Sequence, residues 1–187
     1  MIKNFVFLCA LCVLCGESLS RAADPCKSGL EVGQRPGPYT FIVATGPQRG
    51  QSYCYICETA DRPAVVVFAR KPSEALGKLV NQIDKAVADH KKDDLRAWVT
   101  FVSKDQVALD AELLKWGPKH AVKLTPLGVF EDPDGPPAYR LGKDAEVTVI
   151  LFVKRKVTAN FAFRPGELND EALAEVLKAL AGVVGGK

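Results

Sequence analysis

Two strand-length runs of almost uninterrupted apolar residues constrain the fold of this chain more than any other feature of its sequence. They are Ala64–Ala69 (Ala-Val-Val-Val-Phe-Ala) and Val147–Val153 (Val-Thr-Val-Ile-Leu-Phe-Val). A strand with one face in solvent alternates apolar and polar residues, whereas a continuous apolar run is typical of a strand covered on both faces. Strands of this kind occur in sheets with packed layers on each side, so the two runs predict an α/β domain.

The rest of the sequence predicts strands and helices in alternation. Further strands are predicted over residues 39–44, 97–102, 127–130 and 157–163, the last joined to Val147–Val153 by a hairpin bend at Lys154-Arg155-Lys156. Apolar stripes with helical spacing predict three helices, from Leu76 to Val87, from Leu109 to Trp116 and from Leu173 to Leu180. Ser73 and Asn169 suit the start of the first and last helix, and Gly117-Pro118 suits the end of the second. We therefore expect one central mixed sheet of about five strands, flanked by helices on both faces.

This order of elements, a βαβ half followed by a β-hairpin and a terminal helix, resembles the thioredoxin-like superfamily. Leu30-Glu31-Val32-Gly33, ahead of a first strand that follows several prolines, is similar to the opening of peroxiredoxin-type domains. The resemblance extends over residues 30–182. It implies a thioredoxin-like α/β fold and directs attention to cysteine chemistry.

Cys54-Tyr55-Ile56-Cys57 is the most informative motif in the chain. Two intervening residues allow both sulfur atoms to face one point, where they can form a disulfide, exchange electrons or bind a metal. In thioredoxin-like oxidoreductases such a pair follows the first buried strand and opens the next helix. Here that place is occupied by residues 70–75, which contain no Cys, and residues 144–148 lack the Pro that the superfamily places near the pair.

The Cys pair precedes the Ala64–Ala69 strand, so we expect it at the N-terminal edge of that strand, opposite the usual catalytic edge of a parallel sheet. Three roles remain open for it: a structural disulfide, a redox-active pair, or a metal site. Cys26 lies in a leader that we expect to be flexible enough to reach the pair, so a metal-binding set of Cys26, Cys54 and Cys57 is a further alternative. His90 and His120 have no ligand spacing to the pair and are expected at the surface.

The N-terminus has the layout of a secretory signal peptide. Lys3 precedes an uncharged apolar run, Phe5 to Gly16, which is too short for a membrane span, and Ser20-Arg21-Ala22 fits a cleavage site after Ala22. We therefore predict a signal peptide over residues 1–22, an irregular leader over 23–38 and a thioredoxin-like domain over 39–187. The expected location is periplasmic or otherwise extracytoplasmic, with no membrane span after cleavage.

Composition excludes several classes of partner. The chain carries 25 basic and 22 acidic side chains, a balance that gives no strong field to attract nucleic acid. No motif for a cofactor is present, and none is expected. The favoured function is thiol–disulfide exchange with a protein partner through Cys54 and Cys57, with Cys54 as the nucleophile by analogy. The sequence leaves open whether the protein is an enzyme, because a non-catalytic scaffold with a structural disulfide and a metal-handling protein fit the same residues.

Overall fold

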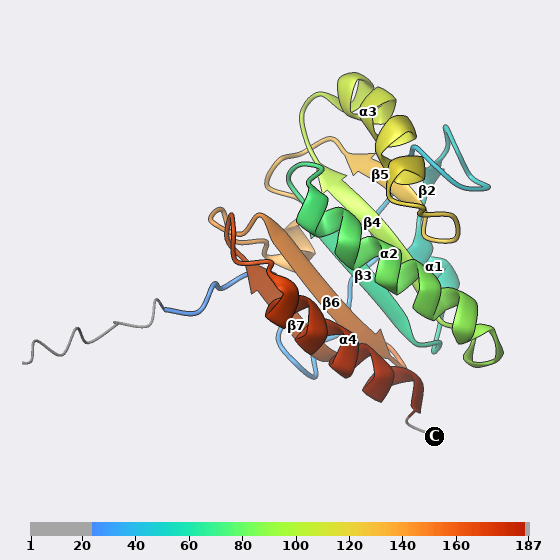
Figure 1. The fold of residues 1–187 in the computed structure, drawn as a ribbon, viewed down its shortest axis with the longest axis vertical. Helices are drawn as coiled ribbons and strands as arrows, with labels where there is room; N and C mark the ends of the chain where they lie inside the picture. Colours follow the sequence, from blue (N-terminus) through green and yellow to red (C-terminus); the bar gives the residue numbers. More distant parts are fainter. Residues whose placement is uncertain (1–23, 186–187) are drawn as a thin grey trace, which may run out of the picture.

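A single mixed sheet forms the centre of the computed structural model, which describes residues 24–185 (Figure 1). Its strands are β1 (Phe41–Val43), β2 (Ser52–Tyr53), β3 (Ala64–Ala69), β4 (Arg96–Val102), β5 (Leu127–Phe130), β6 (Val147–Val153) and β7 (Lys156–Phe163). Their spatial order is β2-β1-β5-β4-β3-β6-β7. The sheet thus has seven strands rather than about five; β1 lies within the predicted strand 39–44, and β2 at the sheet edge was not predicted.

The two apolar runs belong to one sheet, as the sequence predicts, and they lie side by side in it. β3 pairs parallel with β4 and antiparallel with β6, with Val66 opposite Ile150. Every residue of β3 is buried. Val65 and Val67 point into one hydrophobic core, while Val66 and Phe68 point into a second core on the other face of the sheet.

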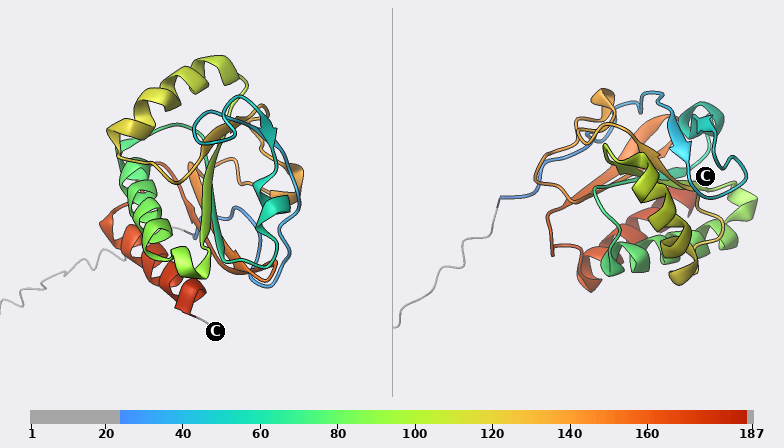
Figure 2. Two further views of the ribbon diagram at one scale, coloured as in Figure 1. Left: turned by 90° about the vertical axis from the view of Figure 1, so that its right-hand side faces the viewer. Right: turned by 90° about the horizontal axis from the view of Figure 1, so that it is seen from above.

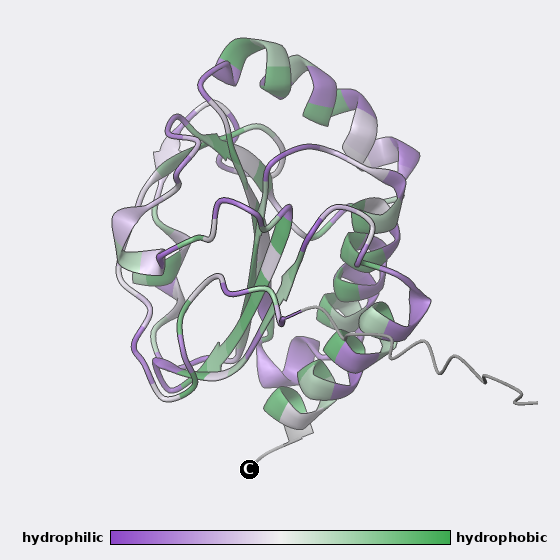
Figure 3. Ribbon diagram, turned by 90° about the vertical axis from the view of Figure 1, so that its left-hand side faces the viewer, coloured by the Kyte–Doolittle hydropathy of each residue, from purple (hydrophilic) through white to green (hydrophobic). Residues whose placement is uncertain are grey.

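The two faces of the sheet are covered differently. The helices are α1 (Tyr55–Thr59), α2 (Glu74–Asp89), α3 (Gln106–Lys119) and α4 (Asp170–Gly185), with short 3-10 helices η1 (Lys91–Asp93) and η2 (Pro137–Tyr139). All three long helices, α2, α3 and α4, lie on one face (Figure 2). Their apolar sides face the strands, as the colours of Figure 3 show. The opposite face is covered by α1, η2 and the leader instead of by long helices.

Capping residues set the helix boundaries close to the predicted positions. Ser73 precedes α2, and its Oγ accepts a hydrogen bond from the Leu76 amide (3.2 Å). Asn169 does the same for α4, accepting from the Ala172 amide (2.9 Å). The prediction that α3 ends at Gly117-Pro118 differs from the structure by one residue, because Pro118 lies in the last turn of α3, which continues to Lys119.

Residues 24–38 contain no helix or strand, as expected for an irregular leader, but they are packed against the domain rather than free. Ser28 Oγ lies 2.6 Å from Thr148 Oγ1 of β6, and the side-chain amide of Asn160 in β7 donates to the Ser28 carbonyl (2.7 Å). Further along, the Gly33 amide donates to the Val157 carbonyl (2.8 Å). The expectation of a flexible leader is therefore wrong, since its polar groups are bonded to the β6–β7 hairpin.

The predicted signal peptide, residues 1–22, lies outside the described residues. Within residues 24–185, none of the helices has the length and hydropathy needed to cross a membrane.

Candidate functional site

Cys54 and Cys57 form a disulfide at the start of α1. Cys54 is the N-cap residue, in an extended conformation, and its Sγ accepts a hydrogen bond from the Cys57 amide (3.2 Å). The two Cα atoms are 5.4 Å apart. The two-residue spacing of the cysteines thus places both sulfur atoms at the first turn of one short helix, where they meet.

The disulfide lies near the N-terminal end of β3, as its position in the sequence predicts. The chain that leaves α1 is held there, because the Asp61 carbonyl accepts a hydrogen bond from the Lys154 amide at the hairpin tip (3.0 Å). Cys57 also shares a surface groove with Phe152, the residue of β6 that pairs with Ala64. The site is therefore built where β3 begins and β6 ends.

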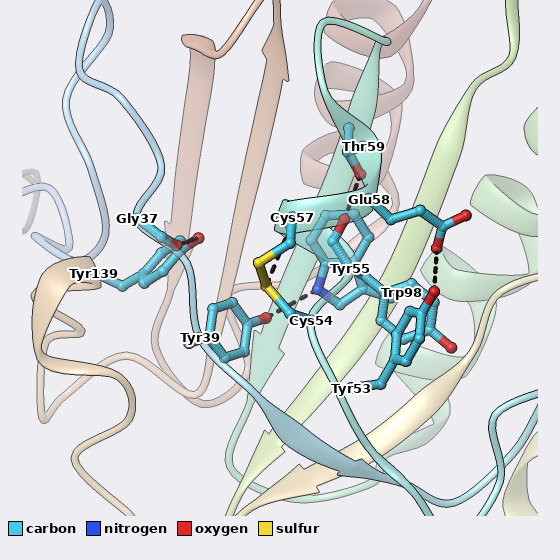
Figure 4. The surroundings of a disulfide bond; sticks show 10 residues. All are labelled: Gly37, Tyr39, Tyr53, Cys54, Tyr55, Cys57, Glu58, Thr59, Trp98 and Tyr139. Atoms are coloured by element: carbon cyan, nitrogen blue, oxygen red, sulfur yellow. Dashed lines mark hydrogen bonds between the residues drawn. A yellow bond between two sulfur atoms is a disulfide. The ribbon is translucent and has the colours of Figure 1, made fainter.

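An aromatic cluster fixes the orientation of α1 (Figure 4). Tyr55, between the two cysteines, is buried; its ring stacks on Trp98 of β4 at a centroid distance of 5.6 Å and an interplanar angle of 22°. Its hydroxyl donates to Gln48 Oε1 (2.9 Å). Below it, the Trp98 indole N–H donates to the Tyr39 hydroxyl (2.9 Å), which lies 2.7 Å from Thr100 Oγ1. This packing holds the disulfide against a rigid layer of side chains.

The two cysteines differ in their access to solvent. Cys57 is exposed, whereas Cys54 is only partly exposed. Cys57 opens into a groove of about 150 Å³ that is lined by residues of the leader, α1 and the hairpin: Arg35, Pro36, Pro38, Ile56, Phe152 and Arg155. The more exposed residue of the pair is thus Cys57, whereas analogy points to Cys54 as the reactive cysteine.

The opposite pole of the sheet, where thioredoxin-like enzymes carry their cysteines, is closed by Arg70. The guanidinium of Arg70 donates to three backbone carbonyls, those of Pro133 (2.7 Å), Ala145 (2.8 Å) and Gly142 (2.9 Å). Ser73 beside it caps α2, as described above. Arg70 and Ser73 thus satisfy backbone groups at this pole, and residues 70–75 contain no Cys.

Cys26 is not brought to the disulfide. Its thiol is partly buried near Asp144, Arg164 and Glu167, and burial together with the Asp144 carboxylate raises its pKa. Asp144 precedes β6 and Arg164 follows β7, so Cys26 lies at the end of the hairpin opposite Cys57. A seven-residue strand such as β6 spans roughly 20 Å, at about 3.3 Å per residue. The set of Cys26, Cys54 and Cys57 therefore does not converge.

The two histidines have different surroundings. His90 follows α2, and its Nδ1 lies 3.2 Å from Asp93 Oδ2 near the surface. His120 was expected at the surface, but its side chain is only 9% exposed. The ring packs against Trp116 and occupies the space left by the missing side chain of Gly77. Among residues 24–185, no group of three or more His, Cys, Asp or Glu side chains is arranged to hold a metal ion.

Comparison with known proteins identifies the fold. No protein-family model and no curated protein sequence matches the chain. A solution structure from Bacteroides thetaiotaomicron, assigned as a protein disulfide isomerase, matches with a TM-score of 0.63 and 16% identity over 86% of this chain and 95% of that one.

Two other structures match at similar length. One, from Chlorobium tepidum, is assigned as a thiol:disulfide interchange protein DsbE, with a TM-score of 0.56 and 16% identity over 81% of this chain and 99% of that one. The other is the peroxidoxin BcpB of Mycobacterium tuberculosis, with a TM-score of 0.57 and 16% identity over 84% of this chain and 99% of that one. The chain therefore has the thioredoxin-like fold, with its CxxC disulfide at the start of β3 and no cysteine at the start of α2.

Proposed function

We propose that this protein carries out thiol–disulfide exchange with a protein partner through Cys54 and Cys57. The observation that carries the proposal is the exposure of Cys57 at a groove, while its bonded partner Cys54 accepts the Cys57 amide hydrogen bond. A buried structural disulfide offers neither an accessible sulfur nor a prepared leaving group. The fold supports the same chemistry, since the matched structures include proteins named for disulfide exchange.

The exchange takes two steps. A partner thiolate attacks Cys57 Sγ, the Cys54–Cys57 bond breaks, and Cys54 leaves as a thiolate that the Cys57 amide stabilises. A second partner thiolate then attacks the partner sulfur of the mixed disulfide and releases Cys57. The partner dithiol is oxidised to a disulfide, and the Cys pair gains its two electrons and two protons. Repeated turnover requires a second thiol–disulfide couple that reoxidises the pair, and the reverse sequence reduces a partner disulfide.

Single cysteine variants test this order of events. We expect Cys54→Ser to accumulate a mixed disulfide on Cys57 when treated with oxidised glutathione, because no neighbouring thiol can resolve it. We expect Cys57→Ser to form far less adduct, since Cys54 is less exposed. Intact mass spectrometry with peptide mapping counts the adducts and assigns each to one cysteine. Ser73→Ala serves as the matched control, because Ser73 caps α2 at the other pole and should leave the exchange rate unchanged.

The redox potential of the pair distinguishes the proposed thiol–disulfide exchange from the alternative, a structural disulfide in a non-catalytic scaffold. An exchanging pair equilibrates with glutathione, whereas a structural disulfide has a potential below about −300 mV. If wild-type protein shows no exchange and both serine variants only lower the melting temperature, the proposed exchange is wrong. The disulfide is then structural and the protein is a non-catalytic scaffold.

We also propose that the chain is exported after cleavage of residues 1–22. The basic residue, the apolar run and the small residues before Ala23 support this proposal. The mass of the protein recovered from the extracytoplasmic fraction of expressing cells tests it, with a mature N-terminus at Ala23 as the expected result. Protein retained inside cells at its full mass contradicts it.

A further inference from the structure

The groove beside Cys57 combines an apolar floor with two cationic side chains. Pro36, Pro38, Ile56 and Phe152 supply the apolar surface, and Arg35 and Arg155 supply the guanidinium groups. These residues come from three segments that are distant in the sequence: the leader, α1 and the β6–β7 hairpin. A guanidinium presents five N–H donors in a planar fork that suits carboxylate oxygens.

The two guanidinium groups of the groove differ in whether they have a carboxylate partner. Arg35 forms no ion pair with any residue between 24 and 185, and Arg155 has one neighbour, Asp61, with Nε 3.2 Å from Oδ1. Glu58, which follows Cys57 directly, accepts a hydrogen bond from the Tyr53 hydroxyl (2.9 Å) and is thereby held by β2. Glu58 keeps its negative charge in this bond but does not line the groove, so Arg35 is the lining cation that has no ion-paired carboxylate among residues 24–185.

The size of the groove distinguishes between classes of substrate. Pockets that enclose a drug-sized small molecule have volumes of roughly 300–1,000 Å³. The groove beside Cys57 has about 150 Å³, which is room for one or two side chains of a chain that continues over the surface. The shape therefore favours a polypeptide segment over an enclosed small thiol.

We infer that Cys57 selects cysteines of partner proteins that lie next to an apolar and an acidic residue in an exposed segment. The apolar side chain enters the groove against Phe152 and Ile56, and the acidic side chain bonds to Arg35 or Arg155. This inference rests on the exchange proposed above and names the substrate class of that site.

Two short peptides with one cysteine test the selection. Each has a leucine beside the cysteine; one has two glutamates as its other neighbours, and the second has two lysines in the same positions. Each peptide is supplied as its disulfide with an aromatic thiol, so attack by Cys57 of the Cys54→Ser protein forms the peptide mixed disulfide and releases that thiol. Quenching with acid and peptide mapping gives the rate of adduct formation on Cys57 itself.

We expect the acidic peptide to react faster than the basic one, and the double variant Arg35→Gln, Arg155→Gln to slow only the acidic peptide. Two exposed ion pairs together give a decrease of about threefold to tenfold, which higher ionic strength reduces further. Lys178→Gln is the matched control, because it removes one exposed positive charge from α4 on the other face of the sheet. Equal rates for both peptides, or equal slowing of both in the double variant, overturn the inference while leaving the exchange intact.

A second measurement separates this inference from the proposed function. Analogues of both peptides that carry serine in place of cysteine cannot form a disulfide, so their binding involves no redox step. Fluorescence anisotropy with wild-type protein measures the affinity of each analogue. Preferential binding of the acidic analogue without exchange at Cys57 supports the groove and contradicts the proposed chemistry. Failure of the acidic analogue to bind more tightly than the basic one at low ionic strength counts against the groove.

Discussion

Arg70 bonds two separate segments of chain to the end of β3, at the pole that thioredoxin-like enzymes use for catalysis. Its acceptors belong to the turn before η2 (Pro133) and to the segment that leads into β6 (Gly142 and Ala145). Only a guanidinium has enough donors, in the right directions, to bond all three carbonyls at once. The residue that follows β3 in this protein thus has a structural role instead of a chemical one.

Replacing Arg70 with Met should lower the free energy of unfolding by about 2–3 kcal/mol, because partly buried carbonyls lose hydrogen bonds from a charged donor. Arg70→Lys should recover only a small part of this loss, since an ammonium group cannot follow the fork geometry. Urea unfolding measures both variants. Adduct formation on Cys57 should remain at the wild-type rate, and a large change in that rate would show that the two poles are coupled.

The sequence could place the Cys pair but could not show which cysteine is exposed. The position of the pair before Ala64 gave the correct end of the sheet. The exposure of Cys57 depends on Phe152 and Arg155, which are remote in the sequence and meet the pair only through the pairing of β3 with β6. The burial of His120 was missed for a similar reason, because it depends on the absence of a side chain at Gly77 on a different helix.

The leader acts as a structural element although it has no regular secondary structure. Its hydrogen bonds to β6 and β7 hold it against the sheet. Leu30 within it is 2% exposed and belongs to the same core as Tyr39 and Phe152. Val32, two residues later, is 68% exposed.

Leu30→Ala should lower the free energy of unfolding by about 2–5 kcal/mol, the range for removing a buried leucine side chain. Val32→Ala is the matched control and should change stability by less than about 0.5 kcal/mol, as for most surface positions. Chemical denaturation of both variants gives the comparison. Similar stabilities for the two proteins would mean that the leader is not part of the cooperative unit.

Elements with a long or repeated pattern could be predicted, and so could the four-residue strand β5, whereas β2 and α1 could not. β3 and β6 were predicted with their observed bounds, because both contain six or seven consecutive residues of one character. β2 has two residues and α1 has five, so neither contains a full period of alternation or of a helical stripe. The packing of the leader also gave no signal, since backbone hydrogen bonds to distant strands do not depend on a local pattern.

Three tyrosines are buried in the core on the face of the sheet that carries the disulfide. Tyr39, Tyr55 and Tyr139 are buried there. Burial is the main cause that raises the pKa of each phenol above its ordinary value of 10.0. The unfolded chain loses these protons near pH 10, whereas the folded chain retains them. The stability that these residues contribute is thus fully present below the unfolded pKa and is lost as the pH rises above it.

We therefore expect unfolding to become easier above pH 10, the ordinary pKa of a tyrosine phenol. Three retained protons correspond to a slope of about 4 kcal/mol per pH unit in the free energy of unfolding. Tyr39→Phe should reduce the slope by about one third, because it removes one of the three groups. Urea titrations at a series of alkaline pH values measure both slopes. A wild-type slope no steeper than that of Tyr39→Phe would contradict the prediction that buried Tyr39 keeps its proton in the folded protein.

The pairing of β3 with β6 has a consequence for how the chain is made. A ribosome releases the N-terminus first, so the central strand at residues 64–69 waits for its neighbour at residues 147–153 until most of the chain has been synthesised. The leader waits even longer, because its bond partner Val157 comes later still. Contacts between such distant residues slow folding. The nascent chain therefore lacks a complete core until residues 147–157 have been synthesised.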